Sequence, residues 1–275
     1  MEEYFNGHSA TATWPWNSTG KTLVSTTTGI AQQEGLLNIN NKVSQYLGNG
    51  WTSEPLEKEN LITPRHLLTM TSGLNDESNW VIKSNLTYLA DAGTRWSYSN
   101  VFQKLIDVVA ASSNQTFENY FNAKLKNKIG MDGFWNFGTI FTIYHSNTRS
   151  MARFGLLFLN KGKWKNEQII NETYLNEAIS TSQNINPSYG YLWWLNGKSK
   201  YMVPGSQTVY PTALVPNAPA DMYAAMGAED QRIYVIPSKN MVVIRMGDAS
   251  DPQNPNFALS GFDAALWDKI NAVVR

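Results

Sequence analysis

The sequence has no cysteine and only three histidines among its 275 residues. Without cysteine it cannot form a disulfide framework, a thiolate zinc site, an iron–sulfur cluster or a cysteine nucleophile. The histidines His8, His66 and His145 form no His-x-x-x-His pair. We therefore expect no metal and no other cofactor, and we assign His66 and His145 to structural roles.

A surplus of charge and a long apolar run are also missing. Lys+Arg and Asp+Glu both number 22, so no basic excess exists to neutralise the phosphates of a nucleic acid. No run approaches the roughly 20 apolar residues of a membrane span, and we expect a soluble protein. No basic-then-apolar signal segment opens the chain, and a periplasmic or secreted location stays open because such a segment is removed on export.

Aromatic residues are abundant, with 10 Trp, 13 Tyr and 11 Phe, which is typical of a folded core and not of a disordered chain. Caps and 3.6-residue periodicity predict helices first, and period-2 or β-branched runs predict strands later. The expected helices are 21–33, 63–72, 99–109, 116–125, 146–160, 171–180 and 260–274, and the expected strands are the end of 1–13, 189–194, 232–236 and 241–246.

This order predicts an α+β fold, in which an antiparallel sheet is flanked by helices and joined to a mostly helical lobe. We expect residues 1–275 to form a single catalytic unit. Its helical lobe would span about 18–185, and its sheet lobe would combine about 1–13 with 186–275. The last helix would turn Phe262, Ala265, Leu266, Ile270 and Val273 inward.

Ser18 and Lys21 form a Ser-x-x-Lys pair at the start of the first long helix. Residues three apart share one helix face, so the lysine amine can reach the serine hydroxyl. A desolvated lysine can lose its proton near neutral pH and then accept one from serine. Alone the pattern is weak, because a capping serine followed by a surface lysine gives the same letters.

Tyr98 and Asn100 form a second pattern, Tyr-x-Asn. A phenol and an amide two residues apart can both face a cleft. The alternative is that Asn100 caps the following helix while Tyr98 packs in the core.

The order of these two motifs and the residues that flank them resemble the serine β-lactamase and penicillin-binding-protein superfamily. The resemblance is strongest to its class C-type branch of esterases, D-aminopeptidases and amide hydrolases. The flanks that resemble it are Ile62-Thr-Pro-Arg-His-Leu-Leu-Thr-Met-Thr-Ser-Gly-Leu74, Gly93-Thr-Arg-Trp-Ser-Tyr-Ser-Asn100, Lys128-Ile-Gly-Met131 and Ser150-Met-Ala-Arg-Phe-Gly-Leu-Leu157. The resemblance runs from about residue 14 to 247 and implies a β-lactamase/transpeptidase-like fold.

Two departures from the family stand out. Ala228, Glu229 and Asp230 occupy the place of its Lys-Thr-Gly, so the cation that holds a substrate carboxylate is replaced by an acidic pair. That pair either faces the substrate, where it would repel a carboxylate, or forms a solvated turn. In addition, 17 residues precede Ser18, whereas the family has a helix and two strands there, so we expect a chain shortened at its N-terminus.

The resemblance implies a serine hydrolase that forms an acyl-enzyme on a small ester or amide. Ser18 would be the nucleophile, Lys21 the general base and Tyr98 the proton shuttle. Asn100 would orient the substrate, Glu229 and Asp230 would contact it, and the backbone N–H of Gln231 would join that of Ser18 in the oxyanion hole.

Two alternatives stand for the aromatic residues Tyr189, Tyr191, Trp193 and Trp194. They could line the substrate pocket, or they could fill the core. The altered third motif also leaves a second function open, a catalytically silent binding or scaffold protein of the same fold. A third, a carbohydrate-binding protein, rests on aromatic content alone.

Overall fold

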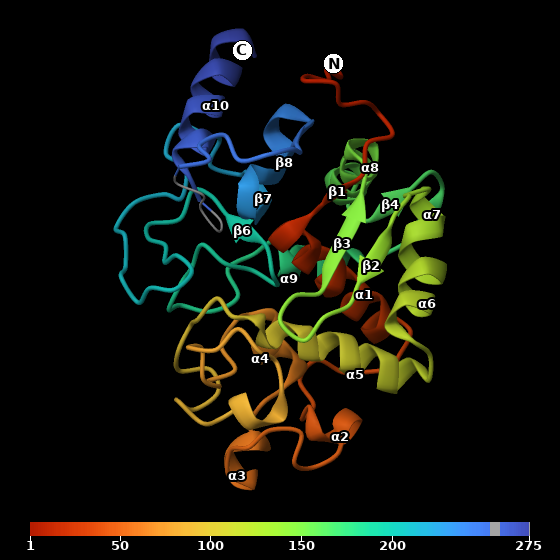
Figure 1. Ribbon diagram of the computed structural model, residues 1–275, viewed down its shortest axis with the longest axis vertical. Helices are drawn as coiled ribbons and strands as arrows, with labels where there is room; N and C mark the ends of the chain where they lie inside the picture. Colours follow the sequence, from red (N-terminus) through yellow and green to blue (C-terminus); the bar gives the residue numbers. More distant parts are fainter. Residues whose placement is uncertain (254–258, 275) are drawn as a thin grey trace.

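The computed structural model describes residues 1–253 and 259–274, and it combines helices with antiparallel sheet as expected. Its main sheet has four strands in the order β6-β7-β8-β9. These are β6 (Trp194–Leu195), β7 (Tyr223–Gly227), β8 (Gln231–Ile236) and β9 (Met241–Arg245). The predicted hairpin is confirmed, with Ile233 opposite Ile244 across β8 and β9. Figure 1 shows this sheet beside the C-terminal helix, while the short helices α2 and α3 lie at the far end of the molecule.

Helices cover both faces of the main sheet. Successive residues of β8 point to opposite sides of the sheet, so one set contacts each helix. Ile233 faces α8 (Thr148–Leu159), which approaches closely at Gly155: a Cβ there would lie 2.6 Å from Val242 Cγ1. On the other face Tyr234 packs edge-on against Trp267 of α10 (Gly261–Val273), with ring centroids 5.7 Å apart. The sheet is therefore held between α8 and α10.

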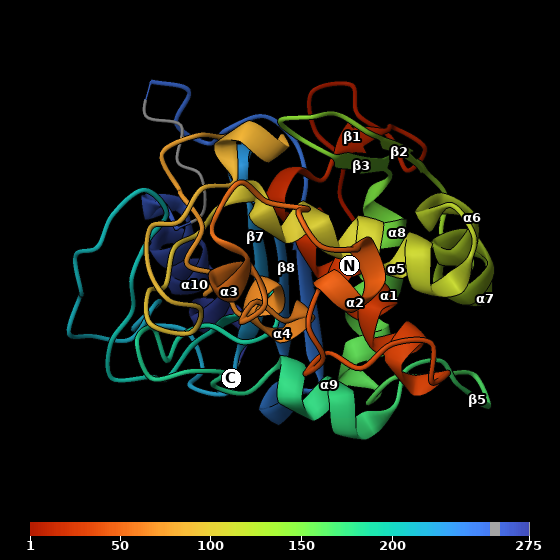
Figure 2. The ribbon, with the colours of Figure 1, turned by 90° about the horizontal axis from the view of Figure 1, so that it is seen from below.

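The helical part of the molecule is built around α1 (Lys21–Gln33), whose bounds match the prediction. Figure 2 shows α1 enclosed between α5 (Lys104–Ser113) and α9 (Glu172–Ala178). Every residue of α1 from 21 to 31 is buried. Three consecutive threonines on it satisfy their hydroxyls on carbonyls four residues back, at 2.7 to 2.9 Å. This burial makes α1 a rigid support for the residues at its N-terminus.

The remaining elements are short. They include α2 (Ser44–Leu47), α3 (Leu56–Glu59), α4 (Pro64–Leu68), α6 (Phe117–Phe121), α7 (Asn127–Ile129), the 3₁₀ turns η1 (Asn17–Gly20) and η3 (Asn100–Gln103), and the strands β1 (Trp14–Pro15), β2 (Phe134–Asn136), β3 (Ile143–Ser146), β4 (Lys163–Trp164) and β5 (Glu167–Gln168). Thr63 caps α4 in a capping box with His66. Among the described residues no helix is long and apolar enough to cross a bilayer.

Two predictions about the strands are wrong, and the one about the inward face of the last helix is right only in part. Residues 1–13 form no strand, and β1 pairs with β3 in a separate small sheet. The segment 189–194 turns instead of extending, because Leu192 has a φ of +63°, and the strand begins only at Trp194. On α10 the predicted Leu266 and Ile270 do pack against the core, but Ala265 and Val273 are exposed. The buried residues are Asp263 and Trp267, since Asp263 faces an arginine inside the molecule.

Candidate active site

Ser18 and Lys21 meet as their spacing predicts. Ser18 lies in η1, which leads directly into α1, and Lys21 Nζ donates to Ser18 Oγ at 2.8 Å. Two hydrogen bonds fix the η1 turn: Thr19 Oγ1 donates to Trp16 O at 2.6 Å, and Trp16 N donates to Tyr144 O at 2.8 Å. A nucleophile and a base within hydrogen-bond reach are the first requirement of covalent catalysis.

The Lys21 amine lies in a nearly closed environment, with only 7% of the residue exposed. Burial lowers the pKa of this lysine from 10.5 to about 7. Its Nζ also lies over the rings of Tyr98 and Phe102, at 4.8 and 4.7 Å from their centroids. These ring faces favour the charged amine and so oppose the effect of burial. The balance leaves the amine much easier to deprotonate than a lysine in water.

Tyr98 completes a cluster with Ser18 and Lys21. Burial raises the pKa of its phenol, while a hydrogen bond with the Ser18 side chain and the charge of Arg232 act in the opposite direction. Its ring stacks on Trp194 at 5.6 Å and meets Tyr189 edge-on at 6.1 Å. The phenol therefore keeps its proton near neutral pH and is held beside the serine.

Asn100 is buried at the entrance of η3. Its Nδ2 donates to Asn79 O at 3.2 Å and to Ile140 O at 2.9 Å, and Gln103 Nε2 donates to the same Ile140 O at 2.9 Å. These bonds fix the loop that carries Phe141. Within the described chain the Asn100 Oδ1 accepts no hydrogen bond, so it can accept one from a ligand.

Ser18, Lys21 and Asn100 line a pocket of about 230 Å³, whereas Tyr98 is not among its lining residues. Its lining residues are Asn17, Ser18, Lys21, Asn100, Phe102, Gln103, Phe141, Thr142, Ile143, Ala228 and Glu229. Sequence reasoning missed six of them, Asn17, Phe102, Gln103, Phe141, Thr142 and Ile143, although Asn17 and Phe102 lie one and two residues from predicted site residues. It placed Ala228 in the third motif without giving it a role. Tyr189, Tyr191, Trp193 and Trp194 are fully buried and absent from this lining, so the core alternative is the correct one for them.

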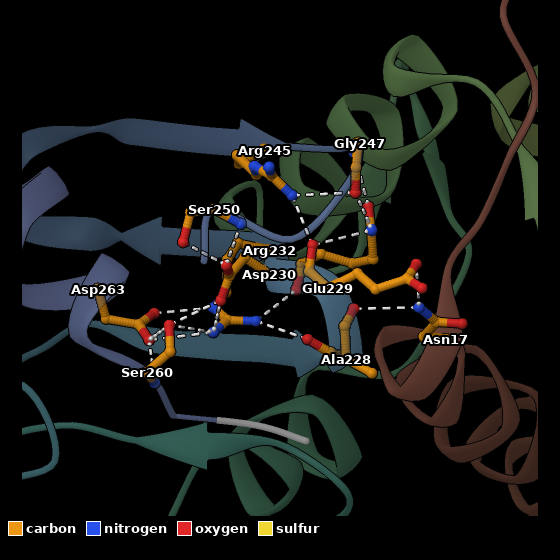
Figure 3. A network of polar contacts seen from close by, with 12 residues as sticks. Asn17, Ala228, Glu229, Asp230, Arg232, Arg245, Gly247, Ser250, Ser260 and Asp263 are labelled. Atoms are coloured by element: carbon orange, nitrogen blue, oxygen red, sulfur yellow. Dashed lines mark hydrogen bonds and ion pairs between the residues drawn. The ribbon is translucent and has the colours of Figure 1, made fainter. Parts of the chain in front are cut away.

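The predicted acidic pair is split. Glu229 and Asp230 lie in the three-residue connection between β7 and β8, and both have positive φ, 58° and 55°. Glu229 is exposed at the rim of the pocket, where its carboxylate accepts from Asn17 Nδ2 at 3.3 Å. Asp230 turns the opposite way and is buried, accepting from Ser250 and Ser260 (Figure 3). Asp230 is thus neither a substrate contact nor part of a solvated turn.

Gln231 is not the oxyanion donor that we expected. Its backbone N–H donates to Ala228 O, and its side chain is bonded to both polar atoms of the Gly247 backbone. Gly227 and Ala228 take its place. A Cβ on Gly227 would lie 3.0 Å from Ser18 N, so the backbones touch there, and Ala228 lines the pocket. The Ala228 N–H is therefore the candidate partner of the Ser18 N–H.

The described residues contain no group of three or more His, Asp or Glu side chains that could hold a metal ion. His66 takes part in the cap of α4, as already described, and His145 lies in β3 with its ring stacked on Phe134 at 5.3 Å. Neither histidine lines the pocket.

Comparison with solved structures gives the same architecture. A β-lactamase from Mycobacterium bovis aligns with a TM-score of 0.69 at 19% identity, over 96% of this chain and 88% of its own. A penicillin-binding protein from Bacillus halodurans aligns with a TM-score of 0.63 at 15% identity, over 97% and 87%. A family VIII carboxylesterase aligns with a TM-score of 0.67 at 13% identity, over 93% and 82%.

At such identities these likenesses establish the fold. No curated protein matches the chain. The sequence model of the β-lactamase family, however, matches residues 2–257, nearly the whole length. The Ser18–Lys21–Tyr98 cluster, the fold and this match agree, and the chain belongs to the β-lactamase family.

Proposed function

We propose that this protein is a serine hydrolase that cleaves a small ester or amide through an acyl-enzyme. Membership of the β-lactamase family supports a hydrolase. The observation that carries the serine mechanism is the 2.8 Å contact between Ser18 Oγ and Lys21 Nζ, an amine whose pKa burial lowers to about 7. Burial leaves part of this amine unprotonated at neutral pH, and the unprotonated amine can accept the serine proton.

The chemistry follows from that contact. Ser18 Oγ attacks the carbonyl carbon while Lys21 takes its proton, and the N–H groups of Ser18 and Ala228 stabilise the resulting oxyanion. Tyr98 donates its proton to the leaving group, the carbonyl carbon's bond to that group breaks, and Lys21 returns a proton to Tyr98. Water then attacks the acyl carbon while Lys21 takes its proton. The bond between that carbon and Ser18 Oγ breaks, and Lys21 passes the proton to Ser18 Oγ, which releases the acid and restores the serine.

The pocket favours a short, uncharged or cationic substrate. Phe102, Phe141 and Ile143 supply apolar walls, and the volume of about 230 Å³ lies below the usual 300–1,000 Å³ of ligand sites. Lys21 is the sole cation among the lining residues, and Ser18 already engages it. The Glu229 carboxylate at the rim would repel a substrate carboxylate. We therefore rank ester or amide hydrolysis ahead of β-lactam hydrolysis.

Intact-protein mass spectrometry tests the proposal. Wild type and Ser18→Ala are incubated separately with a fluorophosphonate and with a penicillin, and circular dichroism verifies that both are folded. We expect a single fluorophosphonate adduct on wild type and none on Ser18→Ala. The penicillin arm reports whether β-lactams acylate the same serine. A folded wild type that reacts with neither probe would instead support a catalytically silent scaffold.

A further inference from the structure

A buried ion cluster lies behind the pocket, on the opposite side of the β7–β8 connection (Figure 3). Arg232 of β8 has 0% exposure. Its Nε and Nη2 contact the two oxygens of Asp263 at 2.8 and 3.0 Å, and Nη2 also contacts Asp230 at 3.1 Å. Removing such charges from water is expensive, and apolar residues can often fill the same space without loss of stability. The cluster therefore calls for a role beyond holding the sheet to α10.

The remaining arm of the guanidinium reaches the backbone next to the pocket. Arg232 Nη1 donates to Gly227 O at 2.7 Å and to Gln231 O at 3.1 Å. The described chain has no cis peptide bond, and in a trans peptide the carbonyl oxygen and the following N–H point to opposite sides. With Gly227 O turned toward Arg232, the N–H of Ala228 points away from the cluster. That is the direction of the pocket, because Ala228 is one of its lining residues.

The neighbouring peptide is fixed from the other side. Asn17 Nδ2 donates to Ala228 O at 3.0 Å, and Asn17 is joined directly to Ser18. Gly227 touches the Ser18 and Thr19 nitrogens so closely that a Cβ would lie 3.0 Å from each. Two successive carbonyls are thus held by side chains from two parts of the fold. The peptide between Gly227 and Ala228 has little freedom to rotate.

We propose that Arg232 is a positioning residue for the oxyanion hole: it fixes and polarises the Gly227–Ala228 peptide so that the Ala228 N–H points at the developing oxyanion. The inference rests on the proposed serine hydrolase function. A cation bonded to a peptide oxygen draws electron density from that peptide and strengthens the hydrogen bond that its N–H donates. Asp263 and Asp230 hold the cation in place.

The test compares variants that disturb the cluster on its two sides. Arg232→Lys keeps the positive charge beside Asp263, but one ammonium cannot reproduce the guanidinium fork and reach Gly227 O as well. Tyr234→Phe is the matched control: it removes the hydroxyl that donates to Asp263, and leaves the bond to Gly227 O in place. Urea denaturation of both variants measures how far each perturbs the fold.

Kinetics use p-nitrophenyl butyrate and the thiono analogue in which sulfur replaces the carbonyl oxygen. Complete loss of one oxyanion donor costs about 10²–10³ in kcat, so for a displaced donor we expect Arg232→Lys to lower kcat for the oxo ester about 10- to 100-fold with KM nearly unchanged. The preference for the oxo over the thiono ester should fall with it, since sulfur uses the N–H donors poorly. Tyr234→Phe should keep both kcat and the oxo/thiono preference.

A variant that does not fold is replaced by the double substitution Arg232→Met with Asp263→Asn, which removes the charge pair together and keeps an acceptor for the Ser260 N–H. A folded variant that lacks the guanidinium but retains the wild-type kcat and oxo/thiono preference refutes the positioning role, while the proposed function stands. If wild type hydrolyses neither ester and Ser18 takes up no fluorophosphonate, the proposed function and this inference fail together.

Discussion

Lys21→Met replaces the buried amine with an apolar side chain of similar length, and its effect on stability should depend on pH. In the unfolded chain the lysine keeps its proton up to its ordinary pKa of 10.5, whereas in the folded protein burial lowers that pKa to about 7. Between these values the unfolded state binds more protons, so the free energy of unfolding of wild type rises with pH. The methionine variant lacks this dependence. Its gain in stability over wild type should be largest below pH 7 and shrink toward pH 10.

The size of the effect follows from the shift. A change from 10.5 to about 7 corresponds to about 5 kcal/mol at 1.36 kcal/mol per pKa unit, of which about 3 kcal/mol falls between pH 9 and pH 6. The ring faces of Tyr98 and Phe102 stabilise the ammonium by about 1 kcal/mol each. They reduce the difference between the two pH values to about 1 kcal/mol if both act in full. We therefore expect the advantage of Lys21→Met to be about 1–3 kcal/mol greater at pH 6 than at pH 9.

Urea denaturation of wild type and Lys21→Met at pH 6, 7.5 and 9 measures this difference. Lys42→Met, at an exposed position, controls for the loss of one positive charge. In parallel the fluorophosphonate adduct on Ser18 should disappear in Lys21→Met. An advantage that does not change with pH, or that grows toward pH 9, would show that burial does not hold the amine neutral and would remove the basis for Lys21 as the base.

Four further outcomes are expected. Wild-type kcat/KM for a neutral ester should rise with pH through about 7 as Lys21 loses its proton, and a rise centred near pH 4–5 would point to a carboxylate base instead. Tyr98→Phe should keep its melting temperature within a few degrees but lower kcat about 10²–10⁴-fold in the same ester assay. Glu229→Gln should raise kcat/KM several-fold for an ester with a terminal carboxylate relative to its neutral isostere, and equal changes for both would contradict a rim charge effect. Gly227→Ala should lower kcat at least tenfold, since its Cβ would press on Ser18 N; unchanged kcat would mean that the contact can relax.

The residues that the sequence predicted well are those whose placement is decided locally. Ser18 and Lys21 are three apart at a helix start, so their meeting depends on one turn of backbone. The hairpin of β8 and β9 was likewise predictable, because two β-branched runs flank a short loop that contains proline. Tyr98 and Asn100 were identified through the family's motif and not through any local rule.

The residues that sequence reasoning misplaced depend on contacts between distant segments. The proposed oxyanion donor is a backbone group, and the amino-acid sequence does not show whether the N–H of Ala228 or that of Gln231 already donates a hydrogen bond within the protein. The inward face of α10 was misjudged because Asp263 reads as a surface residue until Arg232 is placed opposite it. A charged residue inside the apolar run 232–236 was the available signal. It indicates a buried ion partner elsewhere in the chain, although it does not identify that partner.

Because Asp263 lies in α10, the proposed oxyanion hole depends on one of the last segments of this sequence to be synthesised. Arg232 gains the bidentate carboxylate partner that helps to fix it toward Gly227 only after α10 has docked on the sheet. A nascent chain that ended before α10 would hold Ser18, Lys21 and Tyr98 and still lack a stable oxyanion hole. During heating, detachment of α10 would likewise silence the enzyme while α1 remains folded. Loss of hydrolysis should then precede the main unfolding transition, and activity would report the integrity of the C-terminal helix.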